Sequence, residues 1–93
     1  MYTVIREDVR PSADIPFFQL RIPYVDVLFV RKGLTRNHTM SEDGLTRTVT
    51  FKAPSKEAWE AFINDARFRA EFLTEQDKYN AEHGITHTVT SAE

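Results

Sequence analysis

Residues 55–83 contain neither glycine nor proline, and this uninterrupted run constrains the fold more than any other feature of the sequence. Ser55 is a good capping residue for a first helical turn, and Gly84 is placed to end the last one, so the run predicts a helical region. Its large apolar residues fall into two sets on nearly opposite sides of a continuous helix. One set is Trp59, Phe62, Ile63, Ala66 and Leu73, and the other is Ala61, Phe68, Phe72 and Tyr79.

Two arrangements explain the two apolar sets, because a single helix at a protein surface normally buries one stripe. The helix can break near Asn64-Asp65, with Asp65 capping a second helix, so that each piece buries one face. Alternatively, the helix is continuous and its second face meets another subunit. The sequence favours the break and leaves both arrangements open.

Two similar segments, GLTRTVTF (44–51) and GITHTVTS (84–91), have the alternation of strands that follow a glycine. The segment 2–9 also alternates. The segment YVDVLFVRK (24–32) is apolar on both alternating faces except at Asp26, which is typical of a strand covered on both sides. With turn residues at 41–44, these patterns predict strands at 2–9 and 85–90 and a β-hairpin over 24–53.

Three prolines in residues 10–23 predict an ordered, extended loop. Phe17 and Phe18 are too apolar for a free linker, and we expect them to pack against the core or a second subunit. The element order then predicts one α+β domain over residues 1–93. In this fold a small, mainly antiparallel sheet of about four strands packs on one long or two consecutive helices.

Composition excludes several classes of protein. The chain has no cysteine, which rules out disulfides and thiol chemistry. No stretch is apolar for long enough to cross a membrane, and MYTVIREDVR lacks the layout of a signal peptide. We therefore expect a cytoplasmic protein without membrane contact.

The stretch from Ser55 to Thr90 resembles small uncharacterised proteins of tailed phages, and also ferredoxin-like, dimeric α+β-barrel domains. The resemblance covers residues 45–90. It rests on Trp59, Phe62, Asn64, Asp65, Tyr79, Asn80, Gly84 and Ile85. It implies a homodimer whose two sheets pack face to face, and a host cytoplasm if the chain is of phage origin. The chain departs from the ferredoxin-like pattern because residues 10–23 are too short and Pro-rich for a helix between the first and second strands. Relatives of the barrel type include monooxygenases, but none of their catalytic residues can be placed on this sequence.

Residue patterns for catalysis, metals and cofactors are missing. The chain has no P-loop, no GxGxxG and no HExxH, and Gly84 separates His83 from His87, so the two cannot share a helix face. We therefore expect no catalytic residue, no metal ligand and no cofactor, and favour a protein that is not an enzyme.

The best candidate site joins Asp26, Arg47 and His87. Arg47 and His87 occupy equivalent positions in the two similar segments, each between apolar residues on one strand face. A charge buried there needs a partner, and Asp26 in the preceding segment could supply it. The cluster could be a structural ion pair or the polar part of a ligand site.

Three functions follow from these observations. The first is a homodimeric interaction or accessory protein without catalytic activity that contacts a host or viral protein; its interface candidates are Phe17, Phe18, Phe68, Phe72 and Tyr79. The second is a small-molecule binder or enzyme with a pocket between sheet and helix, lined by Trp59 and Phe62. The third, which the acidic composition disfavours, is weak nucleic-acid binding through Arg31, Lys32 and Arg36.

Overall fold

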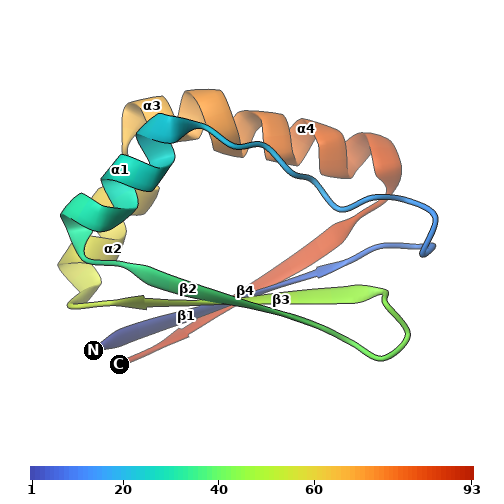
Figure 1. The fold of residues 1–93 in the computed structure, drawn as a ribbon, viewed down its shortest axis with the longest axis horizontal. Helices are drawn as coiled ribbons and strands as arrows, with labels where there is room; N and C mark the ends of the chain where they lie inside the picture. The colour runs from blue at the N-terminus through green and yellow to red at the C-terminus, as the bar shows by residue number, and fades with distance from the viewer.

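The computed structural model describes residues 1–93 and places every helix on one face of a four-stranded antiparallel sheet (Figure 1). The α+β class predicted from the sequence is therefore confirmed. In chain order the elements are β1 (Tyr2–Val9), α1 (Pro23–Lys32), β2 (Thr35–Met40), β3 (Thr46–Ala53), α2 (Lys56–Ile63), α3 (Ala66–Phe68), a π-helical turn η1 (Arg69–Leu73), α4 (Thr74–His83) and β4 (Thr86–Ala92). The strands lie in the order β2-β3-β1-β4. This β-α-β-β-α-β succession is the one that defines ferredoxin-like topology.

The prediction of a strand at residues 24–32 is wrong, because this segment is the helix α1. Its buried residues Val25, Leu28 and Phe29 have helical spacing and pack toward the sheet. Pro23 stands in the first turn, and Gly33 ends the helix with a φ of 69°, donating its backbone N–H to the carbonyls of Phe29 and Val30. The helix that a ferredoxin-like domain needs between its first two strands is therefore present, directly after the Pro-rich loop.

The β-hairpin predicted over 24–53 is correspondingly shorter and consists of β2 and β3. Its turn is held by Asp43, whose carboxylate accepts hydrogen bonds from the Ser41 hydroxyl at 2.6 Å and the Leu45 N–H at 2.9 Å. The Ser41 hydroxyl is the main reason that the pKa of Asp43 lies below its usual value. The two similar segments 44–51 and 84–91 are not neighbours, because β1 lies between β3 and β4.

The helical region breaks at Asn64-Asp65, as the first of the two arrangements predicted. The Asp65 carboxylate accepts the Phe68 N–H at 2.9 Å and so begins the second helical piece. It also accepts the Tyr24 hydroxyl at 2.8 Å, which ties the break to the start of α1. That hydrogen bond raises the pKa of Tyr24, and the one from Phe68 is the largest cause of the lowered pKa of Asp65.

The residues predicted to meet a second subunit make contacts within the chain itself. Phe17 is buried, and the Phe18 ring lies 5.6 Å from that of Phe72 and 5.5 Å from that of Tyr79. Phe68 is buried in the core. The Pro-rich loop covers part of the second apolar set, because its Phe18 packs on Phe72 and Tyr79, whereas Ala61 stays exposed. The sequence alone could not show this, because the landing place of a loop depends on tertiary structure.

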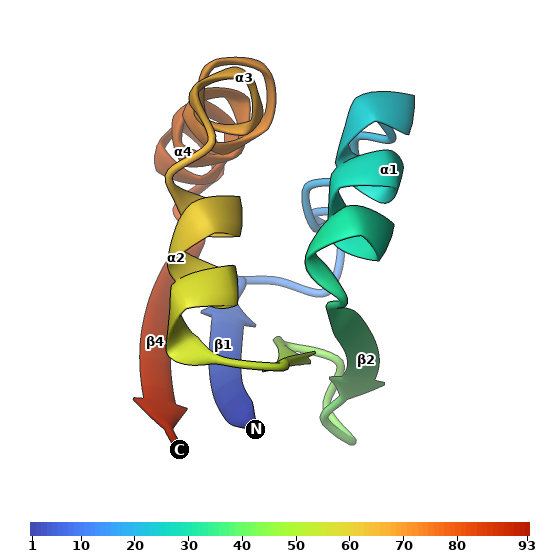
Figure 2. The same cartoon turned by 90° about the vertical axis from the view of Figure 1, so that its left-hand side faces the viewer.

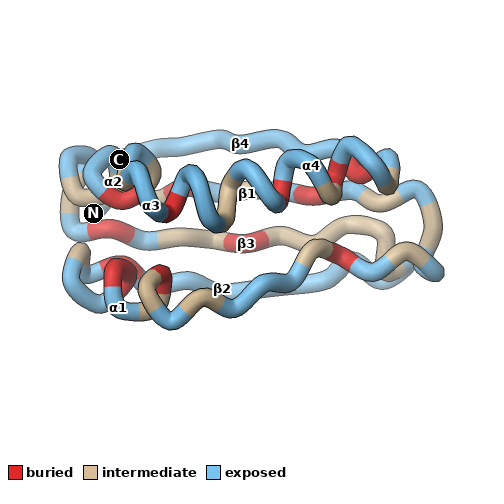
Figure 3. The backbone as a smooth tube through the Cα atoms, turned by 90° about the horizontal axis from the view of Figure 1, so that it is seen from above, coloured by how far each residue is buried: buried red, intermediate tan, exposed pale blue.

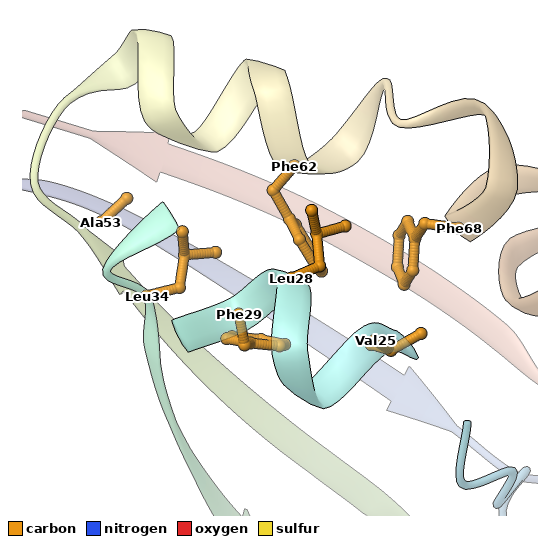
Figure 4. Packing of buried hydrophobic residues seen from close by; sticks show 7 residues of the cluster. All are labelled: Val25, Leu28, Phe29, Leu34, Ala53, Phe62 and Phe68. Carbon is orange, nitrogen blue, oxygen red and sulfur yellow. The ribbon is translucent and has the colours of Figure 1, made fainter. Parts of the chain in front are cut away.

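The main core lies toward one end of the sheet, where α1 and α2 approach each other (Figure 4). Its buried members are Val25, Leu28, Phe29, Leu34, Ala53, Phe62 and Phe68. Seen from above, α1 and the loop follow the β2 side of the sheet, and α2 to α4 follow the β4 side (Figure 3). None of the helices has the length and apolar character needed to cross a membrane.

Candidate functional site

A cleft of about 1010 Å³ lies between the helices and the inner face of the sheet. Figure 2 shows the two sides of this arrangement, with α1 above β2 and the α2–α4 segment toward β4. Side chains of β1 and β3, among them Val4 and Val49, form part of the lining between them. Because strands alternate, these inward-facing residues share one face of the sheet with Asp8 and Arg47.

One end of the cleft is aromatic. Phe51 of β3 lies 5.1 Å from Trp59, measured between ring centroids, and Phe62 lies 4.8 Å from Phe29. All four rings line the cleft. Phe62 is buried, whereas Phe51 and Trp59 are only partly covered. This end therefore offers apolar ring surface that the chain itself leaves incompletely packed.

The other end is charged and centres on Asp8 of β1, whose side chain is 1% exposed. Arg6 donates to both carboxylate oxygens of Asp8, with Nε at 3.1 and 3.2 Å and an Nη at 3.1 Å. Arg47 approaches from β3, with its Nη2 at 3.7 Å from the second oxygen. Two guanidinium groups thus share one buried carboxylate, and both arginines line the cleft.

Arg47 is incompletely satisfied. Its side chain is 15% exposed, its Nη1 donates to the Phe18 carbonyl at 3.2 Å, and its Nε has no hydrogen-bond partner. The ring of Phe17 lies under the guanidinium, 4.9 Å from its central carbon. Burial lowers the pKa of Arg47 below its usual value, and the Asp8 carboxylate opposes this effect.

Another arginine and a histidine lie on the β2 side of the cleft. Arg36 lies over the ring of Phe29 at 5.1 Å, and His38 is its neighbour on the same strand face. Burial lowers the pKa of His38, and the positive charges of Arg36 and Arg47 lower it further. Among all its lining residues the cleft holds four arginines, two aspartates and no lysine or glutamate.

The sequence-predicted cluster of Asp26, Arg47 and His87 does not form. Asp26 is on α1 and pairs with the exposed Arg21 at 3.3 Å. His87 lies in the same row of the sheet as Arg47, but Asp8 stands between them in the register, and His87 is exposed on the edge strand. The carboxylate that serves Arg47 is therefore Asp8 and not Asp26. The alternation of residues 2–9 puts Asp8 on the same strand face as Val4. Only the pairing of β1 with β3 then brings Asp8 next to Arg47.

The cleft has an aromatic end and an end at which Arg6, Asp8 and Arg47 meet. No group of three or more histidine, aspartate or glutamate side chains is arranged to hold a metal ion. Arg31 and Lys32, predicted as candidates for binding nucleic acid, occupy the last turn of α1 and do not line the cleft.

Comparison with known proteins does not assign the chain to a family. No protein-family model matches the chain, and no curated protein matches it. Among solved structures, Rv0793 from Mycobacterium tuberculosis is 14% identical, with a TM-score of 0.46 over 100% of this chain and 96% of that one. The de novo designed protein Foldit4 is 10% identical, with a TM-score of 0.45 over 100% and 98%. At these scores neither likeness assigns a family or a function.

Replacing Asp8 and Asp26 separates a buried ion pair from a surface one. We expect Asp8→Asn to lower the free energy of unfolding by about 3–5 kcal/mol, because it leaves two guanidinium groups without their carboxylate. Asp26→Asn should cost less than about 1 kcal/mol, because its pair with Arg21 is exposed. Urea unfolding followed by Trp59 fluorescence measures both. Equal losses for the two variants would contradict the assignment of Asp8 as the partner of Arg47.

Proposed function

We propose that the chain binds a small organic molecule in the cleft between its sheet and its helices. The observation that carries this proposal is the cleft of about 1010 Å³ lined mainly by apolar side chains, with Arg6, Asp8 and Arg47 gathered at one end and Arg36 beside the aromatic end. Ligand sites in proteins commonly have this size and this combination of an apolar lining with few polar groups.

The state of the lining supports the same proposal. Phe51, Trp59, Phe72 and Leu73 all line the cleft and are only partly buried. Apolar surface in contact with water is unfavourable by roughly 25 cal/mol for each Å². A ligand with an apolar body would remove part of this surface from water, and that gain favours binding.

The interaction protein expected from the sequence loses part of its motivation. It rests on the absence of a catalytic constellation in the sequence and on an excess of apolar surface, and part of that surface is covered where the Phe18 ring packs on Phe72 and Tyr79. A phage origin and a host or viral partner stay predictions. Nucleic-acid binding also stays a prediction, and its residue Arg36 lies in the cleft wall over Phe29.

Filling the cleft tests the proposal. Val89 lines the cleft from β4 and is half-exposed, so Val89→Trp should add bulk there without disturbing the core. We expect the protein to bind the neutral dye Nile red saturably, and the variant to lose at least tenfold in affinity. Val27→Trp is the matched control, because Val27 is similarly exposed on α1 but lies outside the cleft. Absence of dye binding to the unmodified protein, or equal binding by both variants, would refute the proposal.

We also propose that a second copy of the chain covers the outer face of the sheet, the face that carries no helix. Ile5 and Val9 of β1 point to this face and are exposed. Threonines of the neighbouring strands flank these two residues and the exposed Glu7 between them: Thr46, Thr48, Thr50, Thr86, Thr88 and Thr90. Branched side chains of this kind are suited to packing between two sheets.

Sedimentation velocity at micromolar concentration measures this association. We expect the mass of a dimer, and we expect Ile5→Arg to give a monomer because it replaces an apolar side chain of the contact by a long charged one. Val30→Arg, on an exposed position of α1, should leave the dimer intact. A monomer throughout the micromolar range would rule out the homodimer.

A further inference from the structure

We propose that the ligand of the cleft is an amphipathic organic anion, with a ring-bearing apolar body and one oxyanion group that binds Arg47 and Arg6. The inference rests on the proposed binding function and adds the chemical class and the orientation of the ligand. Four properties of the cleft lead to it.

The first property is an excess of positive charge in a place removed from water. The side chains of Arg6, Asp8 and Arg47 are 14%, 1% and 15% exposed. Arg6 occupies both oxygens of Asp8 at hydrogen-bond distance, and Arg47 reaches the carboxylate only at 3.7 Å. One carboxylate therefore serves two cations. A buried charge without full compensation is unfavourable, and an incoming anion would supply the missing partner.

The second property is the set of free donors on Arg47. A guanidinium carries five N–H groups, and here one Nη donates to the Phe18 carbonyl while the Nε has no partner. The guanidinium lies over the ring of Phe17, with its central carbon 4.9 Å from the ring centroid, and this contact restricts its movement. A guanidinium with an unpaired donor suits a carboxylate or similar oxyanion.

The third property is the charge of the cleft as a whole. The four arginines and two aspartates of its lining make it positive, although the complete chain has a net charge of −2. Arg36 adds an exposed cation at the β2 side, over the ring of Phe29. A field of this sign attracts anions and disfavours cationic ligands.

The fourth property is the separation of the charged end from the aromatic end. Arg47 and Phe51 both point inward from β3 and are four residues apart, which corresponds to roughly 13 Å along a strand. Buried Val49 lies between them. A ligand held at Arg47 by its anionic group can therefore place a ring system against Phe51 and Trp59.

Two dyes of different charge test the inference on the complete chain. We expect the anionic dye anilinonaphthalene sulfonate to bind saturably and to accept excitation energy from Trp59, the single tryptophan, which lines the cleft. Arg47→Gln should weaken its binding by about ten- to a hundredfold, the usual effect of a charged hydrogen bond. The affinity for neutral Nile red should change less than twofold, which also shows that the cleft remains folded.

A second variant keeps the test independent of the buried ion pair. Arg36→Gln removes an exposed cation from the cleft wall, and we expect it to weaken the anionic dye severalfold without affecting Nile red. Arg31→Gln is the matched control, because it removes the same charge from an exposed position outside the cleft. It should leave both affinities unchanged.

The outcomes separate the inference from the proposed function. Binding of Nile red without binding of the anionic dye would overturn the inference and leave the function standing. Equal affinity of the unmodified protein, Arg47→Gln and Arg36→Gln for the anionic dye would also overturn it. Absence of Nile red binding would refute the proposed function itself, and the inference with it.

Discussion

The buried carboxylate of Asp8 is the interaction on which the inner face of the sheet depends. Asp8 stands on β1, one of the two central strands, and a carboxylate that is 1% exposed requires cationic partners. Arg6 and Arg47 provide them from the same face of β1 and β3. Both guanidinium groups are largely removed from water, at 14% and 15% side-chain exposure, and they line one end of the cleft. The aromatic end of the same cleft adjoins the main core.

The helices follow this division. Toward the apolar end, Val25 and Leu28 of α1 and Phe62 of α2 are buried in one cluster. Asp65 holds the two sides together at this end, since its carboxylate accepts both the Phe68 N–H and the Tyr24 hydroxyl. The Pro-rich loop brings Phe17 under Arg47 and Phe18 against Phe72, so the charged end is enclosed from the side but not filled. The fold thus produces a cleft with two chemically different ends from one sheet and one break in a helix.

Local features of the sequence sufficed for much of this architecture. The break at Asp65 was predictable because an aspartate followed by a new apolar stripe caps a helix, and Gly84 marked its end. The α1 segment was wrongly predicted as a strand because Val25, Val27 and Val30 favour strands. Pro23 and Gly33, which are typical of the first turn and the end of a helix, were given too little weight. The candidate site could be predicted only in part from the sequence. Arg47 stands out as a charge on an apolar strand face. Its partner Asp8 could not be identified, because the two residues are far apart in the chain and meet only through the pairing of β1 with β3. The sequence predicts that the two phenylalanines of the Pro-rich loop pack against the core or a second subunit, and only the fold shows that Phe17 lies against Arg47 and Phe18 against Phe72.

The central claim is that Arg47, whose charge Asp8 compensates only in part, binds the anionic group of a ligand. The most direct measurement follows the Nε–H resonance of each arginine by nitrogen-15 NMR during titration with an aromatic carboxylate such as naphthoate. The account predicts that the Arg47 resonance shifts saturably and Arg6 follows, while Arg31 outside the cleft does not respond, and that the neutral methyl ester of the same acid leaves Arg47 much less changed. A titration in which Arg47 stays unchanged, or in which acid and ester shift it equally, would contradict the account.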